Sequence, residues 1–222
     1  MNARALTAFA CAIAALASLG SVPAAAGERL DNIVKNNTLR VGTPGDYRPF
    51  AMKEDSGYAG HDIDVVKAMA EVYGWKVEFV PTTWKQMAAD LKDNRFDVAV
   101  GGITRSPARA LTADFLPAYA PFGKVALVNV KMKNKFRTLD DLNQPDKKVA
   151  VKTGSTGDVY ATKNLPEAQI VRLADESACV TEVVQGKADG FLYDQLTIYR
   201  NNVANPDTTE AIFIPFQEAE SW

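Results

Sequence analysis

Hydrophobic and polar positions along the chain form two series, and each series predicts strands that alternate with helices. The first series predicts strands at residues 39–42, 76–80 and 96–100, with helices at 62–73 and 84–92. Gly74 follows the first of these helices at the position where glycine usually ends a helix. This strand and helix order indicates a parallel sheet that is covered by helices on both faces.

The second series repeats the order after an apolar strand at residues 124–130. It predicts strands at 148–151, 168–173 and 190–193, a helix that begins at Asp158, and a helix at 176–185. Residues 91–104 and 183–196 also resemble each other, since each runs from a helix end through a polar turn and an aspartate into a buried strand. We therefore expect two similar lobes with a ligand cleft at the carboxyl ends of their strands.

The first 26 residues differ from the rest of the chain. Arg4 is their only charged side chain, an apolar run extends from Leu6 to Leu16, and residues 22–26 end in small side chains. This pattern predicts a secretory signal peptide over residues 1–26, cleaved near Ala26. The alternative is a membrane anchor, but the apolar run is shorter than the roughly 20 residues that a span needs. The sequence therefore favours a periplasmic protein.

Composition and charge favour a globular protein with a small-molecule partner. The chain has 222 residues, 47% hydrophobic and 23% charged, and its formal charge of -2 becomes -3 when Arg4 is removed. Such a chain is not expected to bind nucleic acid. Cys179 is the only cysteine after residue 26, which predicts no internal disulfide. His61 is the only histidine and has no acid or cysteine cluster at ligand spacing, so we expect neither a metal nor a cofactor.

The glycine-rich loop at residues 154–157 predicts an anion site. It joins a strand to a helix, where unsatisfied backbone amides and the helix dipole favour a negative group. The lysine of a nucleotide-binding P-loop is absent, so a carboxylate is the better ligand. The alternative is a simple strand-to-helix turn in which Ser155 and Thr156 serve as caps.

The loop that leaves the first lobe, residues 101–109, carries Arg105 and Arg109. A guanidinium can hold a carboxylate with two parallel hydrogen bonds, although a lone arginine is usually solvated. The aromatic residues Tyr47 and Trp84 also follow predicted strands and can stack on a ligand or pack in the core. Asp194 can pair with an ammonium group or cap the helix that follows it.

Several segments of the chain resemble the serial motifs of the family 3 periplasmic solute-binding proteins, the polar amino-acid receptors of ABC importers. They are residues 45–50, 57–64, 96–99, Ile103-Thr104 with Arg109, Phe115, and 154–158. The resemblance implies an α/β fold of the two-lobed periplasmic-binding-protein type (type II), in which each lobe has a parallel-rich sheet flanked by helices and hinge strands join the lobes. It implies lobe 1 at residues 27–126, lobe 2 at 127–212, and the start of a return hinge at 213–222. The family has further structure after that hinge, so we expect a fragment of a longer protein.

The resemblance also implies roles for individual residues. Arg109 would clamp the α-carboxylate of the ligand, helped by the Thr104 hydroxyl and by amides at Ser155 and Thr156. Asp194 would receive the α-ammonium group. Tyr47 and Trp84 would line the side-chain pocket and allow either an aromatic or a cationic amino acid. Three more residues complete the expected ligand-binding set: Asp46, Gly102 and Asp158.

Three functions remain open from the sequence, one of them a non-transport sensory or adhesive module with the same fold. The first is a substrate-binding protein of an ABC importer, a monomer that closes on its ligand and then docks on a membrane permease. The second is a periplasmic cyclohexadienyl dehydratase, a branch that the chain resembles at residues 43–50, 123–124 and 136–139 with 144–145. Asp158 would then be the general acid, where the resemblance implies a glutamate. The shorter side chain and the helix N-terminus, which favours an ionised acid, make the receptor the preferred prediction.

Overall fold

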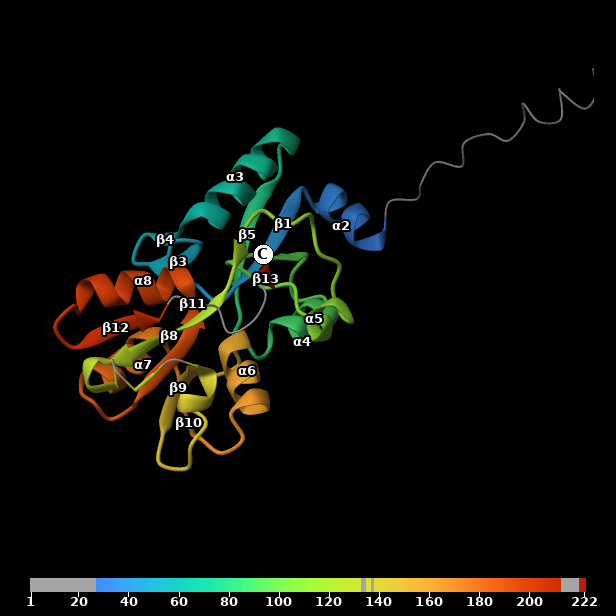
Figure 1. Ribbon diagram of the computed structural model, residues 1–222. Helices are drawn as coiled ribbons and strands as arrows, with labels where there is room; N and C mark the ends of the chain where they lie inside the picture. The colour runs from blue at the N-terminus through green and yellow to red at the C-terminus, as the bar shows by residue number, and fades with distance from the viewer. Residues whose placement is uncertain (1–26, 133–134, 137, 213–219) are drawn as a thin grey trace, which may run out of the picture. The chain divides into compact units, whose positions relative to one another are not determined.

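The computed structural model describes residues 27–132, 135–136, 138–212 and 220–222 (Figure 1). The chain divides into two compact units, Met1–Asn37 and Thr38–Trp222. In the first unit, helix α2 (Glu28–Asn36) ends where Asn37 adopts a left-handed conformation. The predicted signal peptide lies outside the described residues. Within the described ranges, no helix is both long enough and apolar enough to span a bilayer.

The second unit begins with a three-stranded parallel sheet, which defines lobe 1. Its strands β1 (Thr38–Thr43), β5 (Lys76–Pro81) and β6 (Val98–Ala99) lie in the order β5-β1-β6. Helix α3 (His61–Tyr73) precedes β5, and Gly74 ends it in the left-handed conformation, as the sequence predicts. Helix α4 (Met87–Lys92) begins three residues later than predicted. The reason is a turn in which the Gln86 amide donates to the hydroxyl and carbonyl oxygens of Thr83.

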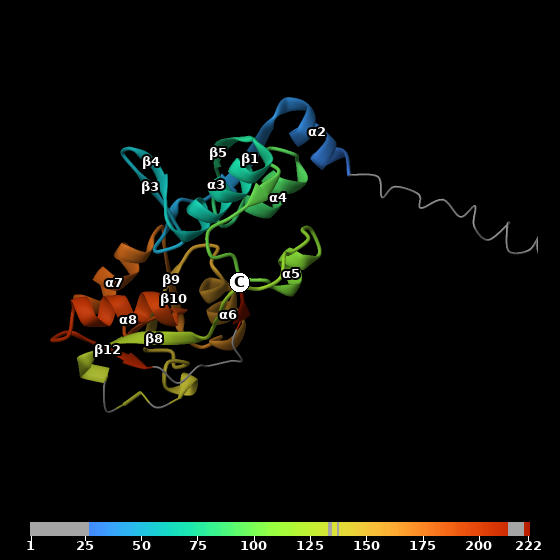
Figure 2. The same ribbon diagram turned by 90° about the horizontal axis from the view of Figure 1, so that it is seen from above.

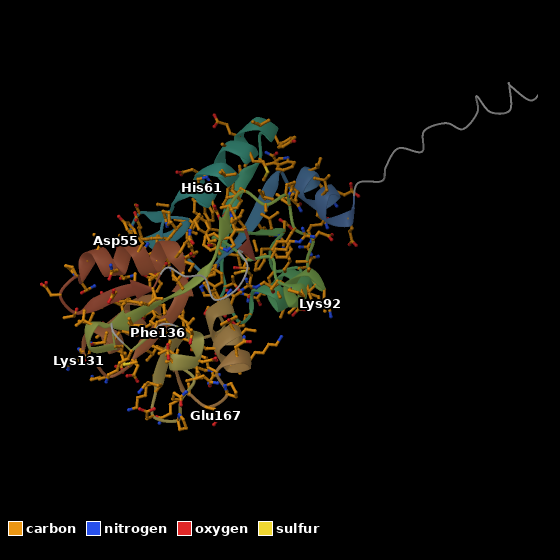
Figure 3. The ribbon with its side chains drawn as sticks, in the orientation of Figure 1. Asp55, His61, Lys92, Lys131, Phe136 and Glu167 are labelled. Atoms are coloured by element: carbon orange, nitrogen blue, oxygen red, sulfur yellow. The ribbon has the colours of Figure 1, made fainter. Side chains whose placement is uncertain are left out.

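A small antiparallel sheet between β1 and α3 is absent from the sequence prediction. Its strands are β2 (Asp46–Tyr47), β3 (Ala51–Glu54) and β4 (Gly57–Ala59). Figure 2 shows β3 and β4 as a hairpin that extends beside α3, and Figure 3 marks Asp55 at its turn and His61 at the start of α3. Strand β2, which pairs with β3, positions Asp46 and Tyr47 near the carboxyl end of β1.

A five-stranded sheet defines lobe 2. Its strands are β10 (Gln169–Leu173), β9 (Lys148–Lys152), β11 (Gly190–Asp194), β8 (Lys124–Asn129) and β12 (Thr209–Ile212), in that order. The first three are parallel, whereas β8 and β12 are each antiparallel to their neighbour. Three helices follow strands β9, β10 and β11: α6 (Thr156–Asn164), α7 (Glu176–Val184) and α8 (Gln195–Ala204).

Short elements connect these parts. They are α5 (Pro107–Ala110), β7 (Pro121–Phe122), the 3-10 turns η1 (Val130–Met132) and η2 (Leu139–Asp141), and β13 (Glu220–Ser221). Strand β13 pairs with β7 in an antiparallel sheet, while residues 213–219 lie outside the described part of the chain. All of β8 belongs to the second sheet, so the strand pairing puts residues 124–126, which were predicted for lobe 1, with lobe 2.

The core of lobe 2 lies on both faces of its sheet. All six residues of β8 are buried, and the apolar side chains of residues 125–128 alternate between two clusters. One cluster packs against α7 and α8 and includes Val125, Leu127 and Phe191. The other includes Phe136, which Figure 3 labels, and Leu192. Both faces of β11 therefore pack against a core cluster, which fixes the position of Asp194 at the end of the strand.

Candidate functional site

One pocket of the second unit is lined by residues from both lobes. Its free volume is about 30 Å³. The lining residues are Tyr47, Trp84, Gly102, Thr104, Arg109, Phe122, Gly123, Lys124, Ser155, Thr156, Gly157, Tyr193, Asp194 and Trp222. They include eight residues of the ligand-binding set that the sequence predicts. The structure thus brings residues that are far apart in the chain to one place.

The glycine loop after β6 forms part of the lobe 1 wall, and Asp62 fixes it. The Asp62 carboxylate, at the start of α3, accepts hydrogen bonds from the amides of Gly101 and Gly102 at 3.0 and 2.8 Å. The Tyr119 hydroxyl donates to the same carboxylate. Gly102 has φ of +65°, and a Cβ atom there would lie 2.7 Å from the Tyr47 ring. A glycine is therefore required where this loop meets the pocket.

Arg109 reaches the pocket from helix α5. Ser106 caps this helix by accepting a hydrogen bond from the Arg109 amide. The Arg109 guanidinium donates from Nη1 to the Thr104 carbonyl oxygen at 3.0 Å, and its Cζ lies 5.8 Å from the Trp84 ring. These contacts hold the guanidinium at the lining. Arg105 is exposed and does not line the pocket, in agreement with its predicted solvated position.

The start of helix α6 forms the facing wall in lobe 2. Ser155 caps this helix, because its Oγ accepts a hydrogen bond from the Asp158 amide at 3.2 Å. The amides of Thr156 and Gly157 have no acceptor among the described residues. A Cβ atom on Gly157 would lie 2.6 Å from the Leu192 carbonyl oxygen, so only glycine lets α6 pack this close to β11. The loop therefore caps its helix and also presents two amide donors to an anion.

Asp158 was predicted to contact the ligand, but it does not line the pocket. Its Oδ2 accepts a hydrogen bond from the Gly154 amide at 3.0 Å, and its Oδ1 pairs with Arg172 Nε at 2.9 Å. Both oxygens are thus bound within lobe 2. These bonds make Asp158 part of the loop structure, and its contact with a ligand stays a prediction.

Asp46 was also predicted to line the pocket and lies behind it instead. The Trp84 indole Nε1–H donates to Asp46 Oδ1 at 2.8 Å. Lys152, at the end of β9, reaches Asp46 Oδ2 at 2.7 Å, as an ion-pair contact without a well-directed hydrogen bond. The Lys152 side chain is 1% exposed, and its ammonium lies 5.4 Å from the Trp84 ring centre. This ion pair joins lobe 1 to lobe 2.

Asp194 caps a helix and also lies at the pocket lining. Its Oδ1 caps α8 by accepting a hydrogen bond from the Thr197 amide at 3.0 Å. Its Oδ2 is buried at the pocket and has no well-formed hydrogen bond among the described residues. Burial raises the pKa of Asp194, and it also raises the pKa of the neighbouring Tyr47 hydroxyl. A buried, incompletely bonded carboxylate is suited to receive a ligand cation.

The prediction missed six lining residues: Phe122, Gly123, Lys124, Gly157, Tyr193 and Trp222. Lys124 carries a detectable signal, since it is a charged residue at the start of an apolar strand, and the strand register pairs it with Asp194. Trp222 carries none. It reaches the pocket because β13 pairs with β7, and its ring centre lies 4.4 Å from that of Phe122.

The described residues contain no group of three or more histidine, cysteine, aspartate or glutamate side chains that is arranged to hold a metal ion. The charged side chains that line the pocket are those of Arg109, Lys124 and Asp194. Arginine and lysine side chains and helix-terminal amides attract a carboxylate, while Asp194 attracts a cation.

Comparison with known proteins gives the following similarities. Residues 39–176 match the family model described as bacterial extracellular solute-binding proteins, family 3. Cyclohexadienyl dehydratase from Pseudomonas aeruginosa is 36% identical over 198 residues, which cover 88% of this chain and 74% of that protein. The L-cystine-binding protein TcyJ from Escherichia coli is 32% identical over 187 residues, which cover 83% of this chain and 69% of that protein.

Solved structures are similar over most of the chain. The ancestral amino acid-binding protein AncCDT-1, a precursor of cyclohexadienyl dehydratase, is 38% identical with a TM-score of 0.75, and the match covers 86% of this chain and 84% of that one. Holo ArgBP from T. maritima is 27% identical with a TM-score of 0.76, and the match covers 86% and 83% of the two chains.

Proposed function

Because the chain belongs to the bacterial extracellular solute-binding proteins of family 3, we propose that it is a periplasmic receptor for an amino acid or a similar small carboxylate. The observation that supports this proposal most directly is the position of Arg109 and of the α6 N-terminus on one pocket, from opposite lobes. The relatives named as amino-acid and cystine binders support the same ligand class.

In the proposed complex, the ligand carboxylate lies between the two walls. The Arg109 guanidinium and the Thr104 hydroxyl approach it from lobe 1, while the amides of Thr156 and Gly157 approach it from lobe 2. The ligand ammonium pairs with the buried Oδ2 of Asp194. Since Tyr47 and Trp84 also line the pocket, we assign them to the ligand side chain.

Binding also requires a change of conformation. The free volume of about 30 Å³ is far below the roughly 300 Å³ of a small ligand pocket, so the lobes must separate before a ligand enters. A ligand that bridges the lobes makes all of its contacts in the closed form, and this difference shifts the population toward closure. We propose that the closed monomer then docks on the membrane permease of an ABC importer.

A thermal-shift screen of the amino acids tests this function, because a ligand that binds only the folded state raises its apparent stability. Titration calorimetry on each compound that raises the melting temperature then gives its affinity. We expect at least one amino acid to bind with a 1:1 stoichiometry. The absence of binding by every amino acid would refute the amino-acid receptor.

A second candidate function is periplasmic dehydration of prephenate or arogenate. It is favoured by the 36% identity to cyclohexadienyl dehydratase. This reaction needs an acid near the leaving hydroxyl group, and Asp158 lies off the pocket with both oxygens bound, which weighs against this role. Ultraviolet detection of prephenate turnover discriminates between the functions: turnover that Asp158→Asn abolishes would establish the dehydratase and displace the receptor.

A further inference from the structure

Lys152 places a buried cation against Trp84, one of the residues that line the pocket. Its ammonium lies over the Trp84 ring at 5.4 Å and against Asp46 Oδ2 at 2.7 Å, and the side chain is buried. An aromatic face and a carboxylate are the two groups that attract a cationic side chain. Both of them are already engaged by a cation that the protein itself supplies.

The other groups around Trp84 reinforce this arrangement. The second Asp46 oxygen accepts the Trp84 indole hydrogen bond, so the carboxylate has a partner on each oxygen. The Arg109 guanidinium lies 5.8 Å from the same indole ring. A ligand cation near Trp84 would therefore lie close to two protein cations without a carboxylate of its own to neutralise it.

The charges of the pocket lining also disfavour a second positive group on the ligand. Arg109 and Lys124 are cations of the lining, and Asp194 is the single carboxylate among the described lining residues. We have assigned Asp194 to the ligand ammonium. A second positive group on the ligand would have no acid to receive it at the pocket.

We infer that Lys152 excludes ligands with cationic side chains, so that this receptor takes an amino acid whose side chain is uncharged or acidic. The inference rests on the proposed function and narrows its ligand class. It makes Lys152 a specificity-determining residue that acts through Asp46 and Trp84 rather than through direct contact. Removing the ammonium leaves the Asp46 carboxylate without its protein cation, so that this carboxylate can attract a ligand cation toward the Trp84 ring.

The test compares binding of lysine and arginine with binding of uncharged and acidic amino acids, measured by titration calorimetry on the full chain. For the wild type, we expect the best uncharged or acidic amino acid to bind at least tenfold more tightly than lysine or arginine. In Lys152→Met, which keeps most of the side-chain volume, we expect this ratio to fall at least tenfold. Lys148→Met removes an exposed ammonium from the same strand and is expected to leave the ratio unchanged.

Other outcomes overturn the inference. A wild-type ratio below tenfold, or a Lys152→Met ratio that falls less than tenfold, would show that Lys152 does not set the selectivity. If Lys152→Met does not fold, Asp46→Asn replaces it: this variant keeps the ammonium and must still reject lysine and arginine, and tight binding of either one contradicts the inference. Wild-type protein that binds cationic amino acids refutes this inference alone, whereas protein that binds no amino acid refutes the proposed function as well.

Discussion

The replacement of Arg109 by methionine tests the proposed carboxylate clamp. The guanidinium lies at the pocket lining, where a ligand carboxylate can accept two parallel hydrogen bonds from it. Each charge-assisted hydrogen bond contributes about 1.5 kcal/mol or more, so the pair contributes about 3 kcal/mol. Since about 1.4 kcal/mol corresponds to a tenfold change, Arg109→Met should weaken ligand binding about a hundredfold.

The measurement is the dissociation constant of the best amino-acid ligand, obtained by titration calorimetry. Arg105→Met is the matched control, because Arg105 is an exposed arginine of the same loop and lies off the pocket. We expect the control to bind within threefold of the wild type. An affinity of folded Arg109→Met that is also within threefold of the wild type would refute the clamp, whatever the ligand.

Three further predictions concern stability and reactivity. Gly102→Ala adds a Cβ atom 2.7 Å from Tyr47 at φ +65°, whereas Gly74→Ala adds one into open space at φ +69°. Gly102→Ala should therefore lower the free energy of unfolding by at least about 1 kcal/mol more than Gly74→Ala. Urea titration measures both values. Burial raises the pKa of Asp194 above 3.8, so the stability that its protonated form contributes is present below pH 3.8 and is lost as the pH rises through the raised pKa. Asp194→Asn keeps the helix cap, and its stability relative to the wild type should therefore increase with pH in urea titrations between about pH 4 and 7. Burial raises the pKa of the Cys179 thiol to about 12, so a thiol reagent at about pH 8 should label it only after unfolding.

Each of these predictions has a contrary result. Equal losses of stability in Gly102→Ala and Gly74→Ala would mean that the loop yields around the new methyl group. A stability difference between wild type and Asp194→Asn that stays constant with pH would mean that Asp194 ionises in the folded protein as it does in the unfolded chain. Rapid labelling of Cys179 in the native protein would mean that helix α7 opens readily.

Periodicity predicted the regular part of the fold well. The parallel strands of both sheets and helices α3, α6 and α7 follow from hydrophobic spacing, because one face of each packs on a core. The antiparallel β2-β3-β4 sheet was missed, since it has three short strands with little buried surface. Strand β8 was found, but its antiparallel direction depends on long-range pairing that no local pattern records.

The candidate site was predictable where motif and strand end coincide. Arg109, Thr104 and Asp194 follow strands, and the geometry of parallel sheets brings such positions together. Asp46 and Asp158 lie off the pocket, because their nearest partners come from elsewhere: Lys152 reaches Asp46 from the other lobe, and Arg172 reaches Asp158 from β10. A sequence shows that an acid is present, but it does not show which base neutralises it.

The amide donors at the start of α6 have a consequence for protein engineering. They belong to the main chain, so every substitution at Thr156 except proline leaves both donors in place. Gly157 is the exception, because any larger residue meets the carbonyl oxygen of Leu192. Directed evolution toward new ligands can therefore vary residue 156 but must keep Gly157. The backbone amides of the loop remain available to bind an acid group.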